Sequence, residues 1–149
     1  MYTTHGDISL ENMAYNDIND SVNLIDFGLS NVYSKNSRYI GTNFCGKMNY
    51  QSPNILKHIK YDARKADCWA FGICVFMIFY GIPPFKKASI KDPYYYNFKN
   101  NHLDDMLQDY GMESYIDDQI NDLIRNILTD ADQRFTMKDI MKHQLFKSI

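Results

Sequence analysis

Residues 5–12 read His5-Gly6-Asp7-Ile8-Ser9-Leu10-Glu11-Asn12, and residues 24–28 read Leu24-Ile25-Asp26-Phe27-Gly28. Carboxylate and amide oxygens are the hard donors that Mg²⁺ prefers, so Asn12 and Asp26 are candidate metal ligands. Asp7 is then left to accept a proton from an attacking hydroxyl group. For each of these residues taken alone, a solvated turn is the simpler interpretation. Their order and spacing favour a site.

The residues between the two stretches predict a β-hairpin. Apolar runs at Met13 to Tyr15 and Val22 to Ile25 flank a cluster of Asn, Asp and Ser residues within 16–21. From Gly28 to Tyr50 no periodicity persists, so we expect a long loop there. Long loops inside compact domains are usually functional.

The second half of the chain predicts helices. A helix capped by Asp62 should run to about Tyr80 and stop at Gly81, and because it is apolar around its circumference we expect it to be central and buried. The other expected helices begin at Ser52-Pro53 and Asp92-Pro93, span His102 to Asp109 and Ile116 to Leu128, and run from the capping box at Thr136 to about His143.

Composition and charge limit the binding partners and the cellular compartment that we expect for this protein. The net charge is −2 and the isoelectric point about 6.0, so we expect neither nucleic acid nor a membrane as a partner. Cys45, Cys68 and Cys74 form no C-x-x-C pair, which favours a reducing compartment. No signal peptide is evident, and the longest apolar run, Cys68 to Tyr80, is shorter than the roughly 20 residues of a membrane span. We therefore expect a cytoplasmic or nuclear protein that is not secreted.

Further motifs follow the first two stretches in a fixed order. They are Cys45 to Asn54, Asp67 to Gly72, Gly81 to Phe85, Asp130 to Thr136, and His143 to Phe146. With residues 5–12 and 24–28, this series resembles the eukaryotic protein kinases, especially serine/threonine kinases of unicellular eukaryotes. The matching family motifs are, in order, H-R-D-x-x-x-x-N, D-F-G, the segment ending in A-P-E, D-x-W-x-x-G, G-x-P-P-F, D-x-x-x-R-x-T and H-P-W-F.

The resemblance implies a fold and a reaction. The fold would be mainly α with a small β-hairpin, the large C-terminal lobe of a kinase, with residues 1–149 forming a partial domain from the catalytic loop to the domain end. The N-terminal lobe would be absent from the chain. The reaction would be transfer of the ATP γ-phosphoryl group, with Mg²⁺, to serine or threonine of a protein substrate, and this chain by itself would be inactive. The alternative is a non-catalytic, pseudokinase-like scaffold or protein-interaction lobe.

The resemblance also implies roles for individual residues. Asp7 would be the catalytic base, and Asn12 and Asp26 would bind Mg²⁺ and through it ATP. His5 and Phe27 would pack as part of a hydrophobic spine. Two further roles are implied: Asp67 would anchor the backbone of the catalytic loop, and Leu29 would favour serine as the acceptor.

Two departures from the family pattern affect regulation and stability. Gly6 stands where the family has the Arg that pairs with an activation-loop phosphate, which argues against control by that phosphate. Hydroxyl groups are nonetheless present in the loop, at Ser34, Ser37, Tyr39 and Thr42. Asn54 replaces the Glu of A-P-E, so an ion pair with Arg134 would become at best a neutral hydrogen bond.

A third departure concerns Ser9 and Lys47. The family usually has Lys at the first position, where it neutralises the transferring phosphoryl group, and Thr at the second. Here the hydroxyl and the ammonium have changed places. We hypothesise that Lys47 reaches across to Asp7 and the γ-phosphate, so that Ser9 and Lys47 are catalytic together with Asp7. The alternative is that Lys47 points into solvent.

Three other features receive simpler interpretations. Gly41 to Lys47 fits the phosphate-loop pattern G-x-x-x-x-G-K, but Met48 occupies the Ser/Thr position, so we reject that reading. His58, His102 and His143 are too scattered for a metal site. Tyr94 to Tyr96 with Phe98 should pack between helices rather than dock a partner, and the acidic set should form a solvated face; that set comprises Asp104, Asp105, Asp109 and Glu113.

Overall fold

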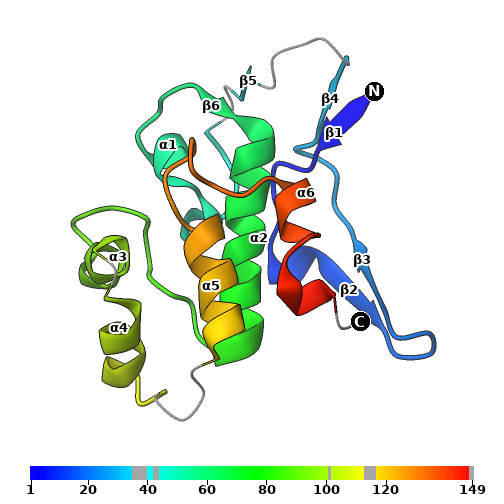
Figure 1. The fold of residues 1–149 in the computed structure, drawn as a ribbon. Coiled ribbons are helices and arrows are strands. Elements are labelled where there is room, and N and C mark those ends of the chain that lie inside the picture. Colours follow the sequence, from blue (N-terminus) through cyan, green and yellow to red (C-terminus); the bar gives the residue numbers. More distant parts are fainter. Residues whose placement is uncertain (35–39, 42–43, 101, 113–116, 148–149) are drawn as a thin grey trace.

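The protein is described by a computed structural model that covers residues 1–34, 40–41, 44–100, 102–112 and 117–147. Helices predominate in the second half, and three two-stranded antiparallel sheets lie mostly in the first (Figure 1). The expectation of a helix-rich chain with a small hairpin is confirmed. Two of the three sheets were not predicted.

Helix α2, Ala63–Tyr80, is the central element of the fold. The Asp62 side chain accepts hydrogen bonds from the backbone N–H groups of Arg64 and Lys65, which caps the first turn as the sequence predicts. Gly81 ends the helix with φ 75°, a left-handed conformation that glycine adopts without strain. The expectation of burial on every side is wrong near the C-terminal end, because Ile78 is 69% exposed.

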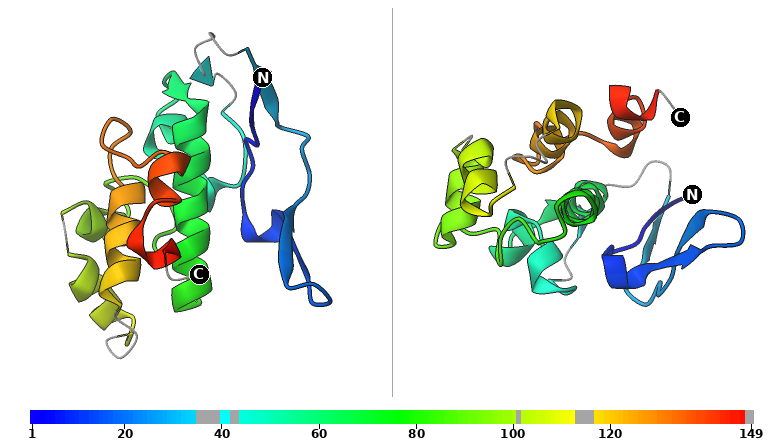
Figure 2. Two further views of the ribbon diagram at one scale, coloured as in Figure 1. Left: turned by 45° about the vertical axis from the view of Figure 1, so that its right-hand side comes forward. Right: turned by 90° about the horizontal axis from the view of Figure 1, so that it is seen from below.

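The core forms where α5, Asp118–Ile127, packs along α2 (Figures 1 and 2). Leu123, Ile124 and Ile127 recur on one face of α5 and are fully buried. Gly72 of α2 lets the two helices approach closely, since a Cβ atom there would lie 2.5 Å from Ile127 Cγ2. The predicted start of this helix, Ile116, lies outside the described residues.

Helices α3, Pro93–Lys99, and α4, Leu103–Asp109, pack against each other on the side of α2 away from the hairpin (Figure 2). Tyr95 and Phe98 are buried, and Phe85 contacts both rings. Tyr94 stacks on Tyr110 with ring centroids 4.7 Å apart. The packing interpretation of the tyrosine cluster is therefore confirmed except for Tyr96, which is largely exposed.

The remaining helices are short. They are α1, Pro53–Leu56, α6, Met137–Ile140, and the 3₁₀ segments Leu10–Asn12, Met48–Tyr50 and Gln144–Phe146. Both reciprocal bonds of the predicted capping box form between Thr136 and Asp139. Helix α6 ends before His143, because the His143 side chain caps the next 3₁₀ segment by accepting from the Leu145 N–H group. No helix in the described part of the chain is both long and apolar enough to cross a bilayer.

The predicted hairpin is present as β2, Met13–Asn16, and β3, Ser21–Leu24, with Met13 opposite Leu24. Two further pairs were missed: β1, Tyr2–Thr4, with β4, Asn31–Tyr33, and β5, Ile40–Gly41, with β6, Tyr61–Asp62. The prediction of an unbroken loop from Gly28 to Tyr50 is therefore wrong. These strands have only two or three residues, too few to show alternation, and their partners are distant in sequence.

Candidate active site

Asp67 of α2 anchors the loop at residues 5–9. The Asp67 carboxylate accepts backbone hydrogen bonds from His5 at 2.7 Å and from Gly6 at 3.0 Å. Burial raises the pKa of Asp67, and these two N–H groups oppose that shift by stabilising the ionised form. The predicted role of Asp67 as an anchor of the loop backbone is confirmed.

His5 and Phe27 make the ring contact that the resemblance implies. Their centroids lie 4.8 Å apart. His5 is buried, and its Nε2 atom lies 3.1 Å from the carbonyl oxygen of Ile25. Phe27 remains 54% exposed, so only one side of its ring is packed.

Gly6 is required by the local backbone. Its φ is +81°, and a Cβ atom at this position would lie 2.5 Å from the carbonyl oxygen of Leu29. An Arg at this position would therefore need a different path for the loop. Gly6, where the family motif has Arg, therefore lies at a point where the backbone passes close to the backbone of Leu29.

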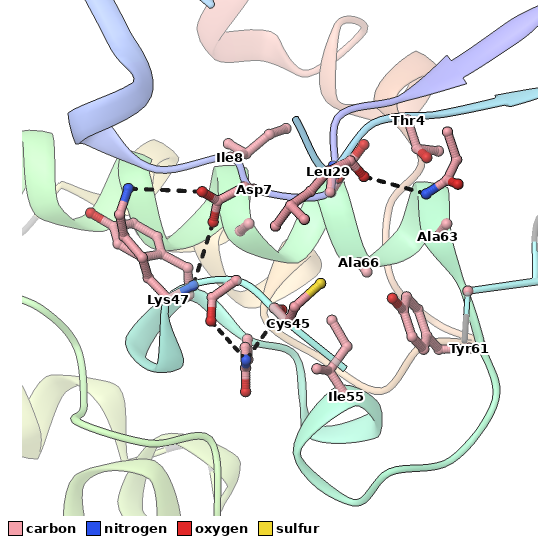
Figure 3. Close-up of a pocket in the computed structure, with 18 of the residues that line it drawn as sticks. Thr4, Asp7, Ile8, Leu29, Cys45, Lys47, Ile55, Tyr61, Ala63 and Ala66 are labelled. Carbon is pink, nitrogen blue, oxygen red and sulfur yellow. Dashed lines mark hydrogen bonds and ion pairs between the residues drawn. The ribbon is translucent and has the colours of Figure 1, made fainter. Parts of the chain in front are cut away.

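Asp7 is held by two donor groups, the Asn12 side-chain amide and the Lys47 backbone N–H. Asn12 Nδ2 donates to the Asp7 carboxylate at 3.0 Å and to its carbonyl oxygen at 2.8 Å. The Lys47 N–H group donates to Asp7 Oδ1 at 3.4 Å. The side chain is only 16% exposed, yet it borders a cavity of about 130 Å³ between the 5–9 loop, residues 45–51 and α2 (Figure 3). A hydroxyl group that entered the cavity from this side would meet the Asp7 carboxylate in a fixed orientation.

Asn12 and Asp26 are brought to one end of the hairpin. The Ile25 N–H group donates to the Asn12 carbonyl oxygen at 3.0 Å and extends the β2–β3 pairing by one residue toward Asp26. Because the Asn12 amide nitrogen donates to Asp7, the Oδ1 atom of Asn12 remains as a hydrogen-bond acceptor. Asp26 is exposed, has a positive φ of 61°, and accepts from the Gly28 N–H group.

This pair of oxygen donors fits a magnesium ion that keeps water or phosphate oxygens as its other ligands. Among the described residues, no group of three or more His, Cys, Asp or Glu is arranged to hold a metal ion.

The Lys47 side chain is 37% exposed, and its ammonium group lies against residues 7–11. The Nζ atom donates to Ser9 Oγ at 2.7 Å. It also lies 4.0 Å from Asp7 Oδ2, at the outer limit of an ion pair (Figure 3). Ser9 is fully buried. Gly46, with φ +92°, allows the backbone before Lys47 to pass beside the Asp7 carboxylate. The contact predicted between the exchanged residues is present.

Two residues that the sequence analysis did not single out complete this cluster. Glu11 Oε2 lies 3.6 Å from Lys47 Nζ, and the Tyr50 hydroxyl donates to the same oxygen at 3.2 Å. One signal was available for Glu11, which lies two residues after Ser9 and so next to the expected position of the Lys47 ammonium group. The sequence carries no such signal for Tyr50.

Comparison with known proteins matches residues 1–146 to the family model "Protein kinase domain". The chain belongs to the protein kinase family. Over 145 residues it is 33% identical to "Probable serine/threonine-protein kinase MARK-A" of Dictyostelium discoideum, which covers 97% of this chain and 13% of that protein. It is 28% identical to the human "SNF-related serine/threonine-protein kinase" over 152 residues, covering 100% of this chain and 18% of that protein.

A plant kinase is equally similar. "CBL-interacting serine/threonine-protein kinase 13" of Arabidopsis thaliana is 32% identical over 146 residues, which is 96% of this kinase chain and 27% of the relative. The chain thus spans less than a third of the length of these curated kinases.

Arg134 makes structural contacts in this kinase chain. The Arg134 guanidinium donates to the carbonyl oxygens of Thr129 and Lys65 and lies 4.8 Å over the Trp69 ring. Burial lowers the pKa of Arg134 to about 10, which leaves it charged at neutral pH. Within the described residues no hydrogen bond joins Arg134 to Asn54, so even the neutral bond considered above is not formed.

Lys47, the last residue of the rejected phosphate-loop pattern, is followed by the 3₁₀ turn Met48–Tyr50, and its ammonium group donates to Ser9. His143 lies 2.9 Å from Asp122, and Asp104 pairs with Arg125 on the surface. Ser37, Tyr39, Thr42 and Glu113, all named in the sequence analysis, lie outside the described residues, as Ile116 does.

Proposed function

We propose that this chain carries the acceptor-binding and metal-binding half of a serine/threonine protein kinase active site. The observation that supports this most strongly is the arrangement of Asp7. Its carboxylate is oriented by Asn12 and the Lys47 backbone, and its loop is anchored by Asp67. The substrate would be a protein that offers a serine or threonine hydroxyl.

In this proposal Asp7 orients the acceptor hydroxyl and takes up its proton as the phosphoryl group is transferred. Lys47 supplies the positive charge on the acceptor side that the family usually takes from a lysine at the Ser9 position. When bound between Asn12 and Asp26, Mg²⁺ would neutralise charge on the ATP phosphates. Such transfer depends on positioning and charge neutralisation, so small displacements of these groups should be costly.

We further propose that a separate N-terminal kinase lobe completes the ATP site. The hairpin and the residues after it support this, because they present several apolar side chains to solvent; these are Val22, Leu24, Ile25 and Phe27. Exposed apolar side chains gathered in one segment are typical of an interface. The chain alone should therefore bind magnesium-ATP weakly, and calorimetry that showed tight binding would contradict this part of the proposal.

The catalytic assignment is tested by replacing aspartates in a complete kinase that contains this chain. Asp7→Asn should lower kcat by about 10²- to 10⁴-fold with little change in nucleotide affinity. Asp26→Asn should weaken magnesium-dependent nucleotide binding instead. Asp17→Asn, in the exposed hairpin turn, is the matched control and should leave both quantities unchanged. Equal and small effects of Asp7→Asn and Asp26→Asn would refute the assigned roles.

The second candidate function is a non-catalytic scaffold. Gly6 and Asn54 favour it, since both replace charged residues of the family pattern. Turnover by the complete protein that disappears in Asp7→Asn would exclude it. A complete protein that binds its partner proteins but shows no turnover would support it.

A further inference from the structure

We infer that Glu11 and Tyr50 are positioning residues for Lys47 and that they set how closely its ammonium group approaches Asp7. This inference rests on the proposed function for its catalytic consequence. The contacts that support it all lie between described residues of this chain. It gives a role to two side chains that neither the family resemblance nor the metal site uses.

The ammonium group of Lys47 lies between two carboxylates. Its Nζ atom is 3.6 Å from Glu11 Oε2, 4.0 Å from Asp7 Oδ2 and 2.7 Å from the Ser9 hydroxyl oxygen. An ammonium group has three donors, so it can serve all three neighbours, although the two carboxylates compete for its charge. As the structure stands, Glu11 is the nearer of the two.

Glu11 is itself held from the segment that carries Lys47. The Tyr50 hydroxyl donates to Glu11 Oε2 at 3.2 Å and lies 3.4 Å from the Leu10 nitrogen, which donates to it. Tyr50 is 4% exposed, and burial raises the pKa of its hydroxyl to about 12, so it stays protonated and remains a donor at neutral pH. The Lys47–Ser9 and Tyr50–Glu11 contacts therefore both connect residues 5–12 with residues 45–50.

The Glu11 side chain is 59% exposed, so its pair with Lys47 should contribute little to stability. Orientation of Lys47 is then the main consequence of the contact.

The inference is tested on the chain itself by NMR, with the nuclear Overhauser contact between the Lys47 ε-methylene protons and the side chain at position 11 as the readout. Glu11→Gln keeps the shape of the side chain and removes its charge, so this contact should be lost as the ammonium group moves toward Asp7. Tyr50→Phe should weaken the same contact to a smaller extent, because Glu11 is then no longer held toward Lys47. The controls are Asp132→Asn and Tyr96→Phe at exposed positions, and both should leave the contact unchanged. The same spectra report whether each variant is folded.

A kinetic measurement in the complete kinase distinguishes positioning from mere packing. Glu11→Gln should change kcat by about threefold or more with the peptide KM nearly constant, and it should have no further effect when Lys47→Thr is already present. A contact between Lys47 and the side chain at position 11 that is unchanged in folded Glu11→Gln overturns the inference, as does a Glu11→Gln effect that persists in the Lys47→Thr background. Loss of this contact in the Glu11→Gln form of a complete protein that has no turnover would support the positioning contact while refuting the proposed kinase activity.

Discussion

Lys47 Nζ donates a hydrogen bond to Ser9 Oγ over 2.7 Å, although the two residues are 38 positions apart in the chain. The contact joins the loop that carries Asp7 to the segment after Gly46. It places one cation and one hydroxyl beside the proposed catalytic base. The same two kinds of group occur in the usual kinase pattern, with their positions exchanged.

The exchange predicts a specific pattern of activities in the complete kinase. Lys47→Thr removes the cation, and Ser9→Lys forces a second ammonium group into a buried position, so each single variant should lose at least about tenfold in kcat/KM, or ~1.4 kcal/mol. The double variant restores one cation and one hydroxyl and should recover part of that loss. Full activity of Lys47→Thr, or strictly additive losses in steady-state assays of all four forms, would contradict the exchange.

Asp67 should matter for stability before it matters for activity. Asp67→Ala leaves the His5 and Gly6 N–H groups without their acceptor. His5 is buried whereas Gly6 is exposed, and an unsatisfied buried donor costs about 1–3 kcal/mol. We expect the free energy of unfolding of the chain, measured by urea denaturation, to fall by about 2 kcal/mol or more. Asp67→Asn retains one acceptor oxygen and should fall between the parent and Asp67→Ala. Exposed Asp132→Ala is the control, and a loss in it as large as in Asp67→Ala would mean that the anchor is unimportant.

The cap of α2 should make stability depend on pH. Burial alone would raise the pKa of Asp62, but hydrogen bonds from the Arg64 side chain and backbone outweigh burial and hold the pKa below its ordinary value. A carboxyl whose pKa is lowered by folding contributes stability above its unfolded-state pKa, and this is lost as the pH falls through the folded-state pKa. Asp62→Asn keeps a capping oxygen without the charge, so its stability deficit should shrink between pH 7 and strongly acidic pH.

The matching variant for the cap itself is Asp62→Ala. It should cost about 1 kcal/mol at neutral pH, because the first turn of α2 loses its acceptor. Both variants can be followed by thermal unfolding monitored by circular dichroism. A deficit of Asp62→Asn that grows on acidification would show that the charge of Asp62 is not stabilising.

Packing between α2 and α5 leaves no room at Gly72. The added methyl group of Gly72→Ala would lie 2.5 Å from Ile127 Cγ2 and 2.9 Å from Leu128 Cδ2, and both of those residues are buried. Overpacking of this kind costs about 1–3 kcal/mol, which should exceed the gain of about 1 kcal/mol in helix propensity. Denaturant unfolding should show net destabilisation, whereas Ile78→Ala on the exposed side of the same helix should stay within about 0.5 kcal/mol of the parent. A stabilised Gly72→Ala chain would mean that α5 can move away.

The sequence by itself determined the elements whose signals are local. The cap at Asp62, the stop at Gly81 and the capping box at Thr136 each depend on residues within one helical turn, so they were predictable. The same holds for the hairpin, whose strands are joined by a short turn. Asp7, Asn12 and Asp26 could be nominated because their spacing along the chain is itself the motif.

Only the tertiary structure decided which distant groups meet. The pairs β1–β4 and β5–β6 join strands too short to carry a pattern, and the Tyr50–Glu11 contact joins residues 39 positions apart. The Arg134 guanidinium likewise reaches the backbone and the Trp69 ring rather than Asn54. Such contacts follow from how α2 packs against the first half of the chain. Hydrophobic packing is non-directional. The order of residues alone therefore does not specify which polar side chains this packing brings within hydrogen-bonding distance.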